Sequence, residues 1–272
     1  MSLVTSDWLE ENINKVKLID CSWHMPNVKR DAYKEYLKEH ISGAIFFDLD
    51  KYSATNTDLP HMLPSPINWE KIVSNLGINN NDRIIIYDNS DVLSSCRCWY
   101  NFIYFGHNPN LVSVLNGGLK KWILENKIVD GNKTKIQRSN YIAKEKKNLV
   151  KNINQVNLNI HLNEFFVIDA RSKERFDGKV PDPRKNVKSG SIPNSICLPF
   201  RDIINEDNTF KNKEQISKIF NQIINIKHNN IVFSCGSGVT ACVLALAYSL
   251  LNNTYSPTIY DGSWAEYGKI KL

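Results

Sequence analysis

Long apolar runs are missing from this sequence, and so is a leader-like beginning. No stretch approaches the roughly 18 consecutive apolar residues that a membrane-spanning helix needs. Residues 1–13 contain no basic segment followed by an apolar one, so they lack the pattern of a secretory signal. We therefore expect a soluble cytoplasmic protein that binds no membrane. A mitochondrial location stays open, since a transit peptide can be removed before the first residue of a mature chain.

Cysteine is scarce, with six residues in a chain of 272. This density is too low for a disulfide framework, and no pair has the Cys-x-x-Cys spacing typical of zinc sites. We expect reduced thiols and no metal. The cysteines are Cys21, Cys96, Cys98, Cys197, Cys235 and Cys242.

A strong excess of one charge is also missing. The 34 Lys and Arg residues exceed the 28 Asp and Glu residues by only six, and they form no basic arm or stripe. This pattern favours an ordinary solvated surface over nucleic-acid binding. A mildly positive surface would still attract small anionic substrates.

What the sequence does contain is an internal repeat, whose parts keep their order. Four segments of the first half correspond to four of the second: Val16–Trp23 to Phe166–Ser172, His40–Ala44 to Ser191–Ser195, Ile84–Asp88 to Ile231–Cys235, and Leu115–Trp122 to Tyr260–Trp264. Short β-branched apolar runs followed by helical patterns indicate βα units. The fold class is therefore α/β, with two tandem domains that each hold a mostly parallel sheet flanked by helices.

The repeat also suggests where the domains divide. Residues 132–157 are rich in Asn, Lys and Gln and show no apolar period, so we expect a linker there between domains at 1–131 and 158–272. Within the domains, helical patterns occur at 31–40, 68–76, 213–226 and 240–251.

Cys235 lies where an apolar strand, Ile231–Ser234, gives way to a glycine-containing loop and then a helix. Ligands of open α/β sheets bind beyond the carboxyl ends of strands, and the start of a helix offers free N–H donors and partial positive charge. Gly236 and Gly238 allow the backbone to bend so that N–H groups can converge on an anion. A thiolate held in this way is stabilised and available as a nucleophile.

Two other interpretations of Cys235 are weaker. A buried, inert cysteine would sit among packing side chains rather than Gly and Ser. A cysteine-dependent phosphatase needs an Arg six residues after its cysteine to clamp phosphate, and that position is Ala241. The six-residue loop suits a single sulfur atom better than a phosphate.

The loop Cys235–Thr240, with the sequence CGSGVT, resembles the active-site loop of the 3-mercaptopyruvate sulfurtransferases in the rhodanese family. Thiosulfate-preferring relatives carry two basic residues directly after the cysteine, whereas this chain has Gly236 and Ser237. The resemblance therefore implies 3-mercaptopyruvate as the donor and thiosulfate as the alternative. It continues through His40–Ala44, Phe46–Asp50, Leu59–Pro64, Val114–Gly118, Asp169–Ser172 and Asp261–Trp264.

The resemblance also implies roles for individual residues. Arg175 and Arg184 match two arginines that hold the carboxylate and keto oxygen of mercaptopyruvate, a task that suits the guanidinium fork. Ser237, His61 and Asp50 match a set proposed to move protons. The loop backbone should hold the substrate sulfur at Gly236, Gly238, Val239 and Thr240.

Each of these roles has a structural alternative. Either arginine alone could form a structural ion pair, which is the role we expect for Arg171. His61 could simply bond loop backbone.

The first half lacks the nucleophile. Asp88 stands at the position equivalent to Cys235 and cannot carry sulfane sulfur, so the first domain is expected to be catalytically silent. Cys96 and Cys98 fall on an expected helix and are interpreted as packing residues, as is Cys242. In the second half the family's Gly-His-Ile-Pro-Gly reads Gly190–Asn194, which departs from the pattern.

The implied reaction is a double displacement through a Cys235 persulfide, with pyruvate as a product and a thiol or cyanide as acceptor. It needs neither a metal nor an organic cofactor, because sulfur acts as nucleophile and leaving group. The implied partners are a small sulfur donor and a thioredoxin-like dithiol protein, and we expect a monomer or weak dimer. The rival from another class is a non-catalytic rhodanese-like module that binds a partner protein.

Overall fold

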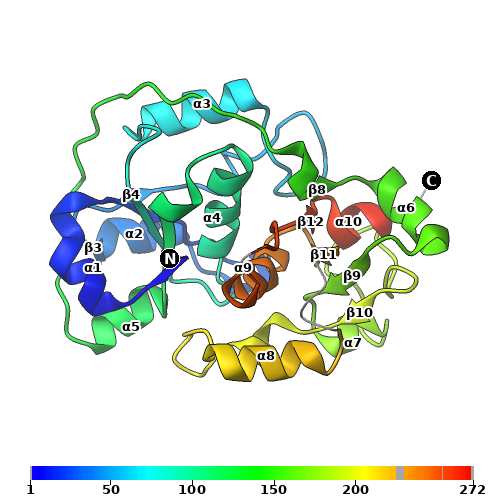
Figure 1. Cartoon of the computed structure of the whole chain (residues 1–272). Coiled ribbons are helices and arrows are strands. Elements are labelled where there is room, and N and C mark those ends of the chain that lie inside the picture. Colours follow the sequence, from blue (N-terminus) through cyan, green and yellow to red (C-terminus); the bar gives the residue numbers. More distant parts are fainter. Residues whose placement is uncertain (1, 225–229, 253, 271–272) are drawn as a thin grey trace. The chain divides into compact units, whose positions relative to one another are not determined.

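The computed structural model describes residues 2–224, 230–252 and 254–270. These form two compact units (Figure 1). The first consists of Met1–Ala54, Leu63–Lys146 and Glu206–Thr209; the second consists of Thr55–Met62, Lys147–Asn205 and Phe210–Leu272. Each unit therefore includes a short segment from the other half of the chain.

The first unit is built on a five-stranded sheet in the order β1-β6-β5-β2-β4, and every pairing in it is parallel. Its strands are β1 (Leu3–Val4), β2 (Lys17–Asp20), β4 (Ile45–Phe46), β5 (Ile84–Tyr87) and β6 (Val112–Leu115), and β3 (His40–Ile41) pairs antiparallel with β7 (Val129–Asp130). Its helices are α1 (Ser6–Asn12), α2 (Ala32–Lys38), α3 (Pro66–Asn75), α4 (Ser95–Tyr104) and α5 (Gly118–Leu124), with 3₁₀ turns η1 (Ile13–Lys15), η2 (Pro26–Val28) and η3 (Pro109–Leu111).

The second unit has a five-stranded parallel sheet in the order β10-β9-β11-β12-β8. Its strands are β8 (Val150–Lys151), β9 (Phe166–Asp169), β10 (Ile196–Cys197), β11 (Ile231–Ser234) and β12 (Ile259–Tyr260). Its helices are α6 (Ile153–Leu162), α7 (Lys173–Phe176), α8 (Lys213–Asn221), α9 (Ala241–Leu251) and α10 (Ser263–Tyr267), with 3₁₀ turns η4 (Lys147–Leu149) and η5 (Phe200–Ile203). Read from the opposite edge, this strand order matches that of the first unit. The predicted α/β class and the internal repeat are confirmed.

The range expected to link the domains, 132–157, contains ordered structure. Its first part packs on the first unit, where Tyr141 is 2% exposed and its amide donates to Ser74 Oγ. Its second part holds β8 and the start of α6, where Asn152 and Gln155 form a capping box. The contact division falls between Lys146 and Lys147.

Two expected helices end earlier than their sequence patterns indicated. Helix α2 stops at Lys38 because His40 and Ile41 pair with β7 instead. Helix α8 stops at Asn221 and a turn follows; residues 225 and 226 of the expected helix lie outside the described residues. The helices at 68–76 and 240–251 correspond to α3 and α9, and Cys96 and Cys98 lie on α4 as expected.

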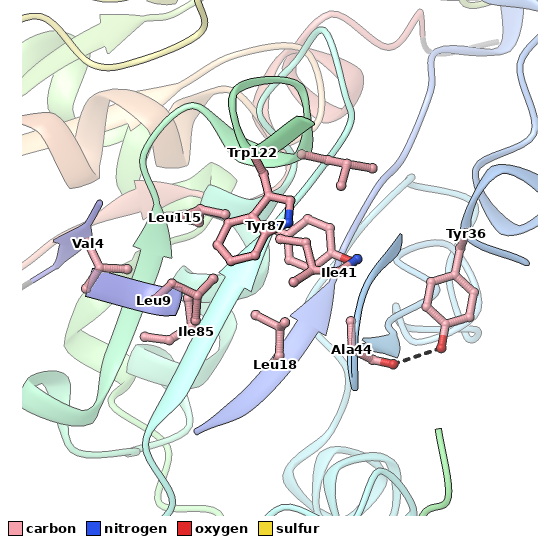
Figure 2. Packing of buried hydrophobic residues seen from close by; sticks show 11 residues of the cluster. Val4, Leu9, Leu18, Tyr36, Ile41, Ala44, Ile85, Tyr87, Leu115 and Trp122 are labelled. Carbon is pink, nitrogen blue, oxygen red and sulfur yellow. Dashed lines mark hydrogen bonds between the residues drawn. The ribbon is translucent and has the colours of Figure 1, made fainter. Parts of the chain in front are cut away.

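The core of the first unit gathers apolar residues of the central strands and of the helices beside them (Figure 2). Leu18 of β2, Ile85 of β5 and Leu115 of β6 pack with Trp122 of α5. At the edge of this cluster the Tyr36 hydroxyl donates a 2.9 Å hydrogen bond to the Ala44 carbonyl. Burial of these side chains holds the sheet against α5 and α1.

In the second unit, alternate residues of β11 face opposite layers, as the pleat requires. Val232 joins a cluster with Val156 of α6 and Trp264 of α10. Phe233 instead contacts Phe220 of α8 and Tyr248 of α9. Helices therefore cover both faces of β11, which fixes the strand whose carboxyl end leads to Cys235. No helix among the described residues has the length and apolarity to cross a membrane.

Candidate active site

Cys235 directly follows β11, the central strand of the second sheet, and is 2% exposed. The loop after it turns at Gly238, whose φ of 75° lies in the left-handed region, and α9 begins at Ala241. The thiol of Cys242, on the first turn of α9, donates to the Gly238 carbonyl at 3.1 Å. This contact supports a structural role for Cys242.

Ser263 fixes the shape of this loop from the side. Its hydroxyl oxygen accepts hydrogen bonds from the amides of Cys235, at 3.2 Å, and Gly238, at 3.1 Å, and it donates to the Tyr260 carbonyl at 2.8 Å. Ser263 is fully buried and has a φ of 49°, which is strained for a residue with a Cβ. One hydroxyl thus ties both ends of the turn to the last strand.

The remaining loop amides are unused. In the part of the chain that the structure describes, the amides of Ser237, Val239 and Thr240 donate to no protein acceptor. Ser237 and Val239 are buried, and buried N–H groups are almost always paired. Such a set of donors beside a cysteine suits an anionic sulfur. The described residues contain no group of three or more His, Cys, Asp or Glu placed to hold a metal ion.

Two arginines lie against the loop at Gly236. A Cβ added to this glycine would stand 3.1 Å from Arg184 Nη2 and 3.4 Å from Arg175 Nη2. Both guanidinium groups are also bound to Asp182, whose side chain is 1% exposed, at 2.8 Å for Arg175 and 3.1 Å for Arg184. The structure therefore brings Arg175 and Arg184 together beside the residue that follows Cys235.

Ser237 and His61 also meet. Their Oγ and Nδ1 atoms are 2.9 Å apart, and both residues are buried. His61 belongs to the 55–62 segment, which is part of the second unit, and the Asp58 carboxylate in the same segment pairs with Lys269. A hydroxyl with an imidazole partner is suited to proton transfer.

Asp50 lies in the first unit, where its carboxylate accepts a 2.9 Å hydrogen bond from Trp23 Nε1. Arg171 forms the expected structural ion pair: its Nη2 lies 2.7 Å from Asp169 and its guanidinium stacks on Trp264.

Asp88 fills the corresponding loop of the first unit with its own carboxylate. One oxygen accepts the amide of Ser90 and the other accepts the amide of Ser95. Burial raises the pKa of Asp88, and these hydrogen bonds oppose the rise. In the first unit, the side chain at the position that corresponds to Cys235 thus accepts amide donors of its own loop.

Two residues of the site were not singled out from the sequence. Asp182 lies between two prolines and two positions before Arg184, and this Pro-Asp-Pro setting is the local signal that could have indicated a fixed turn. Ser263 lies in a segment that repeats between the halves, but its left-handed backbone and its two amide contacts depend on the folded chain.

Comparison with known proteins agrees with this geometry. A family model described as the Rhodanese-like domain matches residues 5–125 and 146–269. The chain is 38% identical to thiosulfate/3-mercaptopyruvate sulfurtransferase 1, mitochondrial, of Arabidopsis thaliana, over 97% of this chain and 75% of the relative. It is 34% identical to 3-mercaptopyruvate sulfurtransferase of Rattus norvegicus, over 98% and 91%.

Among solved structures, SseA of Escherichia coli, a 3-mercaptopyruvate sulfotransferase with the rhodanese fold, superposes with a TM-score of 0.86. The two chains are 32% identical, over 97% of this chain and 99% of SseA. The expected resemblance is confirmed, and the chain belongs to the rhodanese family of sulfurtransferases.

Proposed function

We propose that this protein transfers sulfur from 3-mercaptopyruvate through a persulfide on Cys235 to a thiol or cyanide acceptor, releasing pyruvate. The observation that carries the proposal is the placement of Cys235 in a loop with unused buried amides, next to two arginines at Gly236. The names of the relatives from Arabidopsis and rat support the same donor.

In the first half-reaction the Cys235 thiolate attacks the sulfur of the donor. The carbon–sulfur bond breaks, its electron pair passes to carbon as the pyruvate enolate, and a proton converts the enolate to pyruvate. Arg175 and Arg184 hold the carboxylate and keto oxygen, since each guanidinium can donate two parallel hydrogen bonds. The unused amides of Ser237, Val239 and Thr240 stabilise the thiolate and then the persulfide.

The proton for the enolate comes from the Ser237 hydroxyl, with His61 as its hydrogen-bond partner. Asp50 completes the proposed proton-transfer set by resemblance to the family. Gly236 leaves room for the arginines, and Gly238 permits the turn. In the second half-reaction an acceptor thiolate attacks the outer sulfur and regenerates the Cys235 thiolate.

We further propose a thioredoxin-like dithiol protein as acceptor and a monomer or weak dimer as the working form. The cytoplasm is the proposed location, with mitochondria as the alternative that the Arabidopsis relative supports by its name.

The test is intact-protein mass after incubation with 3-mercaptopyruvate or, separately, thiosulfate, with pyruvate assayed in the same samples. We expect the wild type to gain one sulfur atom that dithiothreitol removes, and Cys235→Ser to gain none. A stronger gain from thiosulfate would instead identify a thiosulfate sulfurtransferase. No gain from either donor would refute the catalytic proposal and favour a binding module.

A further inference from the structure

One carboxylate holds both arginines of the proposed donor site. Asp182 Oδ2 accepts from Arg175 Nη2 at 2.8 Å, and Asp182 Oδ1 accepts from Arg184 Nη1 at 3.1 Å and from the Arg184 amide at 3.0 Å. The amide contact is an Asx turn, and Pro181 and Pro183 restrict the backbone on either side. Asp182 is therefore a fixed anchor for both guanidinium groups.

Each arginine has further N–H groups that no described residue accepts. Arg175 Nε is buried and has no hydrogen-bond partner among the described residues. Arg184 Nη2, which faces the Cβ position of Gly236 at 3.1 Å, likewise has no acceptor within the described part of the chain. Asp182 binds one terminal nitrogen of each guanidinium. Because the guanidinium group is planar and rigid, this contact restricts the directions of its remaining N–H groups.

Asp182 also changes the charge of the site. Its burial acts to raise its pKa, but hydrogen bonds from Arg175 and from the Arg184 amide, with the charges of both arginines, outweigh burial and hold the pKa below its usual range. The carboxylate is therefore ionised at neutral pH. Two guanidinium groups and one carboxylate leave a single net positive charge beside Cys235.

We propose that Asp182 is a specificity-determining residue, which orients Arg175 and Arg184 and reduces their charge to one, so that the site favours a monoanionic donor over a dianionic one. This inference rests on the proposed function, and it explains why the protein would prefer 3-mercaptopyruvate to thiosulfate. A monocarboxylate neutralises the cluster, whereas thiosulfate would leave an excess negative charge in a partly desolvated place.

Asp182→Asn tests this directly, because it removes the charge and keeps the shape. Losing a hydrogen bond to a charged group should lower kcat/KM for 3-mercaptopyruvate about ten- to hundredfold, mainly through KM. Thiosulfate should lose less or gain, so we expect the thiosulfate-to-mercaptopyruvate ratio of kcat/KM to rise at least about tenfold. Persulfide formation in a single turnover, monitored by intact-protein mass at fixed ionic strength, gives kcat/KM for each of the two donors.

Asp177→Asn is the matched control. It makes the same charge change five positions away, but Asp177 pairs with Lys173 and Lys179 rather than with the two arginines. The donor ratio should stay at the wild-type value. Asp182→Glu keeps the charge and moves the carboxylate, so it should slow both donors while changing the ratio much less than Asp182→Asn.

A wild-type measurement guards against a variant that does not fold. Pyruvate and oxalate have similar sizes but one and two negative charges, so pyruvate should raise the melting temperature at lower concentration than oxalate. Oxalate binding as tightly as pyruvate would overturn the charge argument. So would an equal loss of both donors in Asp182→Asn, or an equal ratio shift in Asp177→Asn. Absence of persulfide in the wild type would instead count against the proposed function, and the pyruvate and oxalate comparison would still report on the net charge of the arginine and Asp182 cluster.

Discussion

The Nδ1 atom of His61 lies 2.9 Å from the hydroxyl oxygen of Ser237, although 176 positions separate the two residues in the sequence. His61 has a φ of 61° and is buried. A histidine held in the left-handed region is uncommon, and such backbone strain is found preferentially at functional sites. The contact gives the serine of the Cys235 loop a partner that can accept or supply a proton.

We predict that His61→Gln and Ser237→Ala each lower kcat for pyruvate release from 3-mercaptopyruvate by about tenfold to a thousandfold. The double variant should be no slower than the slower single variant, because the two side chains act as one unit. Rate constants for pyruvate release and for persulfide formation, measured at one pH, show which step each variant slows. His161→Gln, on the exposed face of α6, is the control. Strictly additive losses would show that the pair does not act together.

Ser263 should be required for the shape of the loop. In Ser263→Ala the buried amides of Cys235 and Gly238 lose their shared acceptor, and each unsatisfied group costs about 1–3 kcal/mol. We expect a lower urea midpoint and slower persulfide formation together. Ser189→Ala, which removes an exposed hydroxyl bonded to a carbonyl, should change neither. Wild-type persulfide formation in Ser263→Ala would contradict this role.

Substitution of Gly236 should mainly affect substrate binding, whereas substitution of Gly238 should mainly affect stability. In Gly236→Ala the new methyl stands 3.1 Å from Arg184 Nη2 and 3.4 Å from Arg175 Nη2, so the guanidinium groups must move by a few tenths of an ångström. We expect the KM for 3-mercaptopyruvate to rise several-fold with little change in stability. In Gly238→Ala the φ of 75° becomes strained, at a cost of about 1–2 kcal/mol. Steady-state kinetics measures the rise in KM expected for Gly236→Ala, and urea unfolding measures the loss of stability expected for Gly238→Ala. If both variants showed the same changes in KM and in stability, the two glycines would not have different roles.

The sequence predicted those parts of the molecule that local patterns specify. Apolar runs with β-branched residues located β5 and β11, and the Gly-containing loop after β11 made Cys235 the candidate nucleophile. Asp88 was predicted not to carry sulfur, and the structure adds that its carboxylate accepts the amides of Ser90 and Ser95. Local residue types were sufficient to predict these elements because each strand and the loop after it are continuous in the sequence.

Contacts between distant segments could not be predicted in this way. Ser263 acts through a hydroxyl that reaches a loop 28 positions earlier, and Asp182 acts through arginines that were themselves named only by resemblance. The end of α2 at Lys38 depends on strand pairing by His40 and Ile41, which overrides helix propensity. Tertiary partners decide each of these features.

The buried carboxylate of Asp20 should make the first unit less stable as the pH rises. Burial raises the pKa of Asp20 to about 6, although the Ser22 amide and hydroxyl donate to its Oδ1 atom. In the unfolded chain its pKa is about 3.9. Between these values the folded state binds more protons than the unfolded state, so the free energy of unfolding falls as the pH rises from about 4 and levels off above about 7.

Asp20→Asn should remove this pH dependence, since its amide oxygen can still accept from Ser22 while its ionisation is lost. The stability of the variant relative to the wild type should be about 2 kcal/mol greater at pH 7.5 than at pH 4.5, because each pKa unit corresponds to about 1.4 kcal/mol and most of the shift from about 3.9 to about 6 lies between these pH values. Urea unfolding at both pH values measures the difference. Asp31→Asn is the contrasting case: hydrogen bonds from Lys34 lower the pKa of Asp31, so its contribution is present at neutral pH and is lost as the pH falls. Parallel pH curves for wild type and Asp20→Asn would mean that Asp20 ionises in the fold as freely as in the unfolded chain, and that burial of the β2 carboxyl end does not govern its charge.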